Sequence, residues 1–206
     1  MPFTPPPVVK SFIEDGGYCT GYFGPFGCAK TTAGVMKAYC YAQAMPGARI
    51  AVIRDTWPNL RDTTQKTFFE WFPEGVAGRY EREPKTFWLY TAGEPVEILF
   101  RAMRYRADIE NVLSLDLAAA WADEPQGGVS WRGEQGVLHE PGINEDLFHG
   151  ILARVGRQQG YHPMAWLTGN PPPPTHWITK LFGYDPGKSG CNPPKNQRHE
   201  VIPVPG

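Results

Sequence analysis

Short runs of apolar residues alternate along this chain with longer segments in which apolar residues recur every three or four positions. A short continuous apolar run is typical of a strand covered on both faces, and the longer spacing is typical of an amphipathic helix. Their alternation predicts an α/β fold with a mostly parallel central sheet flanked by helices. The predicted strands are residues 18–23, 49–54, 86–91, 96–103, 117–124 and 164–168. The predicted helices are residues 32–45, 60–71 and 108–115, with two more that begin near Asn144 and at Thr175.

The pattern also predicts a hairpin and two segments outside the folded domain. Residues 86–91 and 96–103 flank a short turn segment with glycine and proline, which predicts an antiparallel hairpin. Residues 1–10 are rich in proline and predict an extended N-terminal segment. Residues 184–206 are rich in proline, glycine and polar residues, and they predict a linker or mobile tail. The folded domain is then residues 11–183.

The composition is that of a globular protein without a global charge. The chain has 206 residues, 41% of them hydrophobic and 13% aromatic, which is enough for one sizeable α/β domain with a buried core. The formal net charge is −1. A charge so close to zero excludes a global basic field, so any contact with nucleic acid has to use local patches.

The cysteines and the N-terminal residues indicate a soluble, intracellular protein. Cys19, Cys28, Cys40 and Cys191 form no C-x-x-C pair, so reduced thiols are the simplest interpretation. The N-terminus lacks the basic and apolar regions of a signal peptide. No apolar run approaches the ~18 residues that a membrane span needs, so no membrane contact is expected.

The strongest chemical signal is the segment GPFGCAKTT at residues 24–32, which follows one predicted strand and precedes a helix. A strand, a glycine-bearing loop, Lys-Thr and a helix form the layout of a phosphate-binding loop. In such a loop Lys30 reaches the β- and γ-phosphates of ATP, and the hydroxyl of Thr31 ligates Mg²⁺. The alternative is a strand-turn-helix corner with an incidental lysine. The residues expected to bind the nucleotide are Gly24, Gly27, Cys28, Ala29, Lys30, Thr31 and Thr32.

One position departs from the usual phosphate-loop pattern. Ala29 stands where G-x-x-x-x-G-K-[ST] has its second glycine. Because this residue opens the helix, we expect near-helical dihedral angles that tolerate a β-carbon, and therefore a working loop.

Polar side chains at two further strand ends are expected near this loop, because ligands of parallel sheets bind outside the carboxyl ends of the strands. Asp123 ends an apolar strand and suits the acid that holds Mg²⁺ through its water shell, while Glu124 suits the base that orients the attacking water. The alternative is an acidic pair that caps a turn. Asn170 follows the strand 164–168 and is a candidate to contact the γ-phosphate or the water; its alternative is a turn residue before proline.

Five segments, taken in order, resemble the ATPase domain of the large terminase of tailed phages, the motor that pumps DNA into a procapsid. They are GPFGCAKTT, IAVIRDTWPNLRDT, LSLDLAAAWADEP, ILARVGR and LTGNPPPPTHWITKLF, and they cover roughly residues 10–183. By this resemblance Lys30 and Thr31 are the phosphate-loop lysine and hydroxyl, Asp123 and Glu124 are the Mg²⁺ acid and the catalytic glutamate, and residues 168–170 are the coupling segment.

The resemblance also implies a biological setting. It implies hydrolysis of ATP with Mg²⁺ that drives viral DNA into a procapsid in the host cytoplasm during virion assembly. The implied partners are double-stranded DNA, a portal protein, a small terminase subunit and further copies of the chain in a ring, with a monomer when the domain is isolated. Large terminases also carry a nuclease domain with a cluster of metal-binding acids, and this sequence contains no such cluster, so we expect an ATPase domain that does not cut DNA.

Ring ATPases commonly complete their site with an arginine finger from a neighbouring subunit, and two clusters here are candidates. Arg154 and Arg157, expected beside the helix that begins near Asn144, lie in the segment ILARVGR that resembles the family. Arg101, Arg104 and Arg106 follow the hairpin. The alternative for both clusters is a solvated face on which they pair with nearby acids.

Two other functions stay open at this point. One is another P-loop DNA motor or a helicase-like ATPase, which DNA would stimulate without a portal. The other is a non-catalytic domain that binds nucleotide for assembly. Ala29 favours the non-catalytic domain, whereas Asp123 and Glu124 argue against it.

Overall fold

A computed structural model describes residues 3–104, 108–127, 131–132, 138–139 and 141–183. Seven strands form one sheet in the order β1-β9-β6-β2-β5-β4-β3, and two short strands pair separately. The first five of that order are parallel, and the pairs β5–β4 and β4–β3 are antiparallel. The strands are β1 (Cys19–Phe23), β2 (Arg49–Arg54), β3 (Gly78–Glu81), β4 (Thr86–Leu89), β5 (Val96–Ala102), β6 (Ala119–Asp123), β7 (Trp131–Arg132), β8 (Leu138–His139) and β9 (Met164–Gly169).

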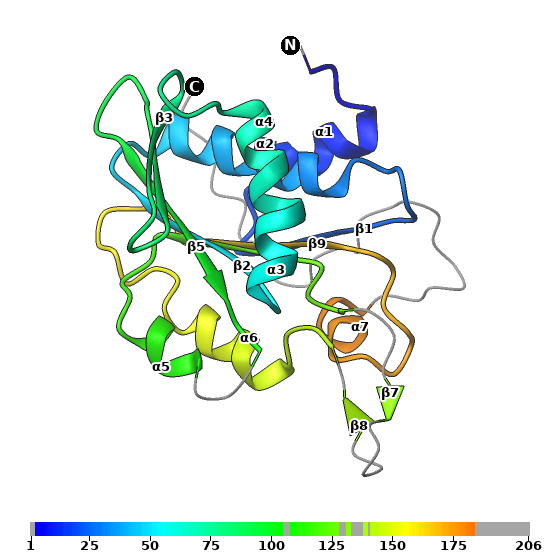
Figure 1. The fold of residues 1–206 in the computed structure, drawn as a ribbon. Coiled ribbons are helices and arrows are strands. Elements are labelled where there is room, and N and C mark those ends of the chain that lie inside the picture. The colour runs from blue at the N-terminus through cyan, green and yellow to red at the C-terminus, as the bar shows by residue number, and fades with distance from the viewer. Residues whose placement is uncertain (1–2, 105–107, 128–130, 133–137, 140, 184–206) are drawn as a thin grey trace.

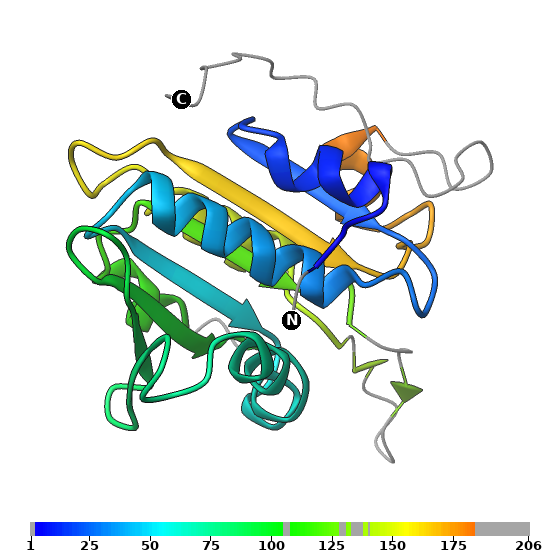
Figure 2. The ribbon, with the colours of Figure 1, turned by 90° about the horizontal axis from the view of Figure 1, so that it is seen from above.

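Helices cover both faces of this sheet. Figure 1 shows α1, α2 and α4 on one side of the strands and α5, α6 and α7 on the other. Seen from above in Figure 2, α2 runs along the strands between β9 and β2, and α1 lies beside it near β1. The helical segments are α1 (Pro7–Glu14), α2 (Lys30–Ala44), α3 (Trp57–Asn59), the π-helix η1 (Leu60–Gln65), α4 (Lys66–Trp71), α5 (Asp108–Leu113), α6 (Glu145–Leu152) and α7 (Trp177–Phe182).

Two hydrophobic clusters, one on each face, explain why the central strands are apolar along their whole length. In β2, Ile50 and Val52 pack with α2 and α4 in one cluster, while Ala51 and Ile53 pack with α6 and α7 in the other. Successive side chains of a strand point to opposite faces, so a strand covered on both sides needs apolar residues at every position. The predicted fold class is confirmed, including the antiparallel β4–β5 pair.

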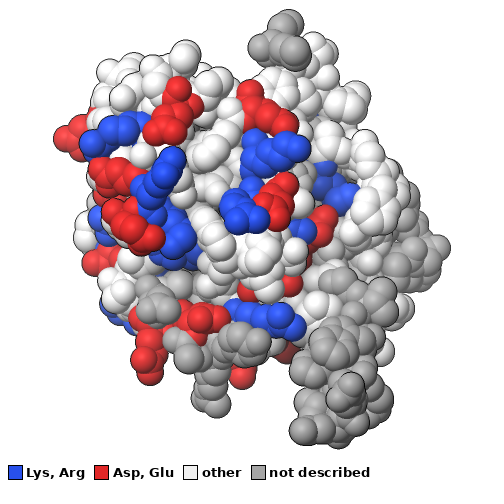
Figure 3. All heavy atoms as spheres, viewed as in Figure 1, with Lys and Arg blue, Asp and Glu red and all other residues white. Residues whose placement is uncertain are grey.

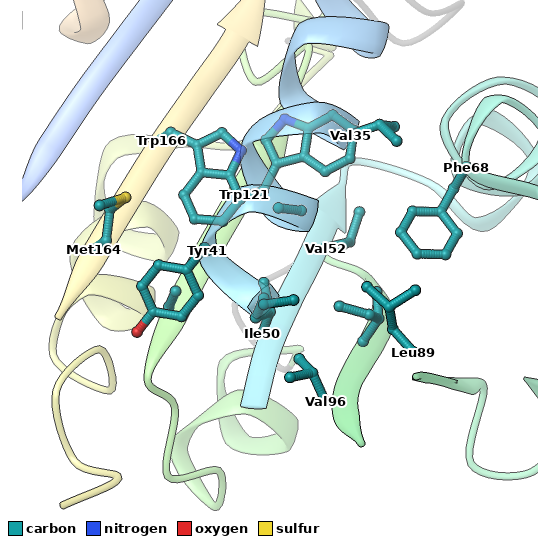
Figure 4. Packing of buried hydrophobic residues seen from close by; sticks show 14 of the residues in the cluster. Val35, Tyr41, Ile50, Val52, Phe68, Leu89, Val96, Trp121, Met164 and Trp166 are labelled. Atoms are coloured by element: carbon teal, nitrogen blue, oxygen red, sulfur yellow. The ribbon is translucent and has the colours of Figure 1, made fainter. Parts of the chain in front are cut away.

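The two largest fully buried side chains, Trp121 and Trp166, belong to the cluster on the α2 face of the sheet. Figure 4 shows the indole rings of Trp121 on β6 and Trp166 on β9 side by side in this cluster. Trp121 approaches α2 so closely that a β-carbon added at Gly34 would lie 2.3 Å from its ring atoms. Gly34 therefore sets the distance between α2 and the central strands.

Several predicted boundaries were wrong. The N-terminal segment is not extended as far as residue 10, because α1 begins at Pro7, where proline is well suited to the first turn of a helix. The helix predicted at 60–71 is part of a longer helical segment that contains a π-helix. β3 was not predicted at all. The predicted tail at 184–206 and Cys191 lie outside the described residues.

Among the described residues, no helix combines the length and apolarity that a bilayer-spanning segment requires. On the face seen in Figure 3, Lys and Arg side chains alternate with Asp and Glu, so no large patch of a single sign is visible there.

Candidate functional site

The loop between β1 and α2 has a backbone suited to an anion. Gly27 has a φ of 83° and Ala29 a φ of 53°, so two residues just before the helix are left-handed. Left-handed residues within a turn can direct neighbouring main-chain N–H groups toward an anion. The near-helical dihedral angles expected for Ala29 were wrong: its positive φ of 53°, with a ψ of 33°, makes it left-handed, a conformation that costs an alanine roughly 1–2 kcal/mol. The loop therefore holds a strained residue directly before Lys30.

The ammonium group of Lys30 lies at the centre of this loop. Its Nζ donates to the carbonyl oxygen of Pro25 at 2.7 Å and lies 5.6 Å from the ring centroid of Phe26. Lys30 is 8% exposed, and none of the ion pairs among the described residues involves it. A nearly buried cation with a carbonyl oxygen as its hydrogen-bond acceptor, at the N-terminus of a 15-residue helix, suits the phosphates of a nucleotide.

Asp123 ends β6 at the same edge of the sheet and is completely buried. Its Oδ2 accepts from Thr64 at 2.5 Å and from Thr31 at 3.4 Å, and its Oδ1 accepts from Thr168 at 2.8 Å. Burial raises the pKa of Asp123, while the hydrogen bond from Thr64 and the charge of Arg54 act in the opposite direction. Four elements therefore meet at the carboxylate of Asp123: α2 through Thr31, η1 through Thr64, β9 through Thr168 and β2 through Arg54.

The oxygens of Thr31 and Asp123 fit the needs of Mg²⁺. A hydroxyl and a carboxylate 3.4 Å apart, at the start of α2 and the end of β6, are hard oxygen ligands of the type that Mg²⁺ takes. The described residues contain no cluster of three or more His, Cys, Asp or Glu side chains that could form a cage. Mg²⁺ usually completes its shell with water and substrate phosphates, so this sparse ligand set is compatible with it.

Glu124 follows β6 in a conformation that is uncommon for a residue with a side chain. Its φ is 48°, its N–H donates to the carbonyl oxygen of Thr168 at 2.6 Å, and its carbonyl oxygen accepts from Gly127 at 3.0 Å. Left-handed residues of this kind are concentrated at active sites and ligand clamps. The turn leaves the side chain of Glu124 29% exposed at the carboxyl edge of the sheet.

Sequence reasoning did not place Arg54, at the end of β2, in the site. Its Nη2 lies 2.6 Å from Oε2 of Glu124 and its Nη1 lies 3.6 Å from Oδ2 of Asp123, although the side chain is only 9% exposed. Nη1 also donates to Thr63, and to Thr64 at 3.2 Å. An arginine that ends a strand of buried apolar residues needs a carboxylate partner, and this was the available signal.

The strand order explains how β9 contributes to the site. Because β9 lies between β1 and β6, Thr168 sits between the loop and the acidic pair, where it accepts from Trp121 at 2.8 Å and donates to Asp123. Asn170 follows, and its Oδ1 is buried with no hydrogen-bond partner among the described residues. Together with Phe26, Gln126 and Trp177, Asn170 lines a cleft of about 810 Å³ beside the loop.

The structure does not bring Arg154 and Arg157 to this edge of their own chain. The helix expected to carry them ends at Leu152. The carbonyl oxygen of Arg154 accepts from Leu117, which precedes β6, so both arginines follow α6 near the opposite, amino end of the parallel strands. Arg104 lines the cleft, whereas Arg106 lies outside the described residues. A role of Arg154 or Arg157 in a neighbouring subunit stays a prediction.

The fold is that of a P-loop NTPase. Its marks are the parallel sheet, the loop between the edge strand β1 and α2, and the acidic pair at the end of β6, the strand next to β9. No protein-family model matches the sequence, and no curated protein matches it well enough to count as a relative.

Solved structures of large terminases do match. A large terminase from a thermophilic bacteriophage, in complex with ADP, has a TM-score of 0.61 and 12% sequence identity, covering 79% of this chain and 36% of that one. Another crystal form of the same terminase gives a TM-score of 0.60 at 13% identity, over 79% of this chain and 35% of that one. The ATPase domain of the Thermus phage P74-26 large terminase has a TM-score of 0.58 and 14% identity, over 87% of this chain and 70% of that one.

These similarities establish the fold. The chain has the fold of a large-terminase ATPase domain, which confirms at that level the resemblance seen in the sequence. It spans about a third of the length of the first of these terminases, the one solved with ADP.

Proposed function

We propose that this domain binds ATP with Mg²⁺ and hydrolyses it to drive phage DNA into a procapsid. The observation that carries the proposal is the meeting of Lys30, the Thr31–Asp123 pair and Glu124 at one edge of the sheet. The ADP in one of the matching large-terminase structures, which has the same fold, supports nucleotide binding.

Each residue has a distinct role in this proposal. Lys30 moves from the carbonyl oxygen of Pro25 to the β- and γ-phosphates, which are stronger partners for an ammonium group. Thr31 and Asp123 hold Mg²⁺, which supplies positive charge against the phosphates when it is bound. Glu124 orients the attacking water, and Asn170 is a candidate to contact the γ-phosphate from β9.

Two substitutions separate binding from turnover. Lys30→Ala should weaken ATP binding by ~1.5–3 kcal/mol, or roughly ten- to a hundredfold, because it removes a charged hydrogen bond. Glu124→Gln keeps the shape of the side chain, so ATP should still bind while turnover falls by about 10²–10⁴. Calorimetry with ATP and Mg²⁺ measures the first effect and phosphate release the second. Lys10→Ala, on the exposed side of α1, is the matched control for loss of a lysine.

The outcomes distinguish this proposal from its alternatives. Unchanged ATP affinity in Lys30→Ala would remove the loop assignment. ATP binding by the wild-type chain without any turnover, also in the presence of DNA, would instead favour a nucleotide-binding assembly domain, for which the strained Ala29 is the supporting observation. Turnover stimulated by DNA in the absence of a portal would favour another P-loop motor or a helicase-like ATPase.

We also propose the assembly that the sequence suggested: a homo-oligomeric ring on a portal protein in the host cytoplasm, working with a small terminase subunit, with local contacts to double-stranded DNA. Mixing inactive Glu124→Gln and Arg157→Ala chains on a portal-bearing procapsid tests a finger acting between subunits. Partial recovery of turnover supports it, because a wild-type arginine can then meet an intact Glu124. With both variants shown to assemble, no recovery at any ratio contradicts it, and Arg154→Ala is tested in the same way.

A further inference from the structure

The ion pair between Arg54 and Glu124 joins two strand ends that are far apart in the sequence. Arg54 ends β2 and Glu124 follows β6, and Nη2 of the guanidinium lies 2.6 Å from Oε2 of the carboxylate. Charge-assisted hydrogen bonds of this length are among the strong ones. Because Arg54 is 7% exposed, solvent screens this contact less than it would a surface pair.

The main chain of Glu124 is held from a different strand. Its N–H donates to Thr168 on β9 at 2.6 Å, and the left-handed φ of 48° sets the direction in which the side chain leaves the backbone. The hydrogen bond to β9 holds only the main chain of Glu124. The rotamer of its side chain, and so the position of its carboxylate, depends on the contact with Arg54. Backbone and side chain of Glu124 are thus held by separate neighbours.

Arg54 is in turn held by the π-helix η1. Nη1 donates to the hydroxyls of two consecutive residues, Thr63 and Thr64, and Thr64 also donates to Asp123 at 2.5 Å. Single turns of π-helix occur frequently at functional sites. One guanidinium therefore connects η1 with both acids at the end of β6, and no atom of Arg54 contacts Lys30 or the loop in the hydrogen bonds of the described residues.

We propose that Arg54 is the positioning residue for Glu124: supported by η1, it fixes the carboxylate where that carboxylate orients the attacking water. This inference rests on the proposed function. Arg54 acts through Glu124 and not on the nucleotide, so it should govern the rate of turnover and leave the affinity for ATP unchanged. A misplacement of about 1 Å can cost on the order of 10²-fold in rate, which sets the expected effect.

Arg54→Lys is the first test, with Arg49→Lys as its matched control. Lysine keeps the charge but lacks the planar fork that reaches Glu124 and both threonines together. We expect turnover to fall by about 10–10²-fold while ATP affinity, measured by calorimetry, is unchanged. Arg49 lies at the other end of β2 in an ion pair with Glu97 at 2.9 Å, so Arg49→Lys should change neither quantity.

A second pair of variants separates positioning from a loss of structure. In a Glu124→Gln background, Arg54→Lys should cause little additional loss of turnover, because residues that act as a unit are strongly non-additive. A structural role predicts instead the same fold-loss in both backgrounds. Thr63→Val removes a support of the guanidinium without removing a charge, and it should lower turnover less than Arg54→Lys, again at unchanged ATP affinity.

Each failure points to a different part of the reasoning. Weakened ATP binding in Arg54→Lys would mean that the guanidinium acts on nucleotide binding, directly or through Asp123, and full or increased turnover would mean that it does not position Glu124. Either result overturns the inference alone. If Glu124→Gln turns over like the wild-type chain, the proposed role of Glu124 fails and the inference fails with it. Equal losses of turnover in the two backgrounds would likewise reject positioning.

Discussion

Lys37 makes the stability of this domain depend on pH in a direction that its structure determines. Lys37 lies on α2 and is 1% exposed. Its Nζ donates to the carbonyl oxygens of Phe12 at 2.7 Å and Asp15 at 2.5 Å, at the end of α1, and lies 4.9 Å from the ring centroid of Phe12. Burial lowers the pKa of Lys37 from 10.5 to about 8, although the charge of Asp15 acts to raise it.

The sign and size of the effect follow from this pKa. Between about pH 8 and 10.5 the unfolded chain keeps the proton of Lys37 while the folded chain loses it. The free energy of unfolding therefore increases as the pH rises through this window, and the contribution is lost again as the pH falls through 8. The pKa difference of about 2.5, at ~1.4 kcal/mol per unit, corresponds to roughly 3 kcal/mol.

Urea unfolding followed by tryptophan fluorescence measures this effect. The wild-type chain should gain about 3 kcal/mol relative to Lys37→Met between pH 8 and 10.5. Both chains should carry Cys40→Ser, because Lys37 influences the pKa of the Cys40 thiol. Lys10→Met is the control for removing a lysine, in this case an exposed one on α1. Parallel stability curves for wild type and Lys37→Met would refute the reasoning.

Two further predictions concern α2 and the residue that precedes it. Gly34→Ala should destabilise the domain by ~1–3 kcal/mol in thermal unfolding, because the new β-carbon would lie 2.3 Å from ring atoms of Trp121. A stability equal to that of the wild type would mean that the helix can move away from the ring. Ala29→Gly should raise the free energy of unfolding by about 1 kcal/mol, because glycine adopts the left-handed φ of 53° without strain. A lower free energy of unfolding for Ala29→Gly, measured by urea unfolding, would show that the alanine is not strained.

The central strands and the strand-loop-helix unit around Lys30 were predictable because their signals are local. A strand covered on both faces must be apolar throughout, so β2 and β6 could be recognised from short windows. The loop between β1 and α2 could be placed because a strand, glycines, Lys30 and a helix follow one another directly. Short windows did not predict that α1 begins at Pro7. Carbonyl oxygens at the C-terminal end of this helix accept hydrogen bonds from Lys37, which is distant in the sequence.

The sequence alone determined which groups reach the carboxyl edge of the sheet, because each strand end and the loop after it are adjacent in the chain. Only the tertiary structure decided their neighbours. The order β1-β9-β6-β2 places Thr168 between the loop and Asp123 and brings Arg54 to Glu124, 70 residues further along the chain. It also leaves Arg154 near the opposite end of the sheet, although its sequence neighbourhood favoured the site. The physical reason is that the buried charge of Arg54 needs a carboxylate, and strand order, which no local pattern encodes, decides which carboxylate is within reach.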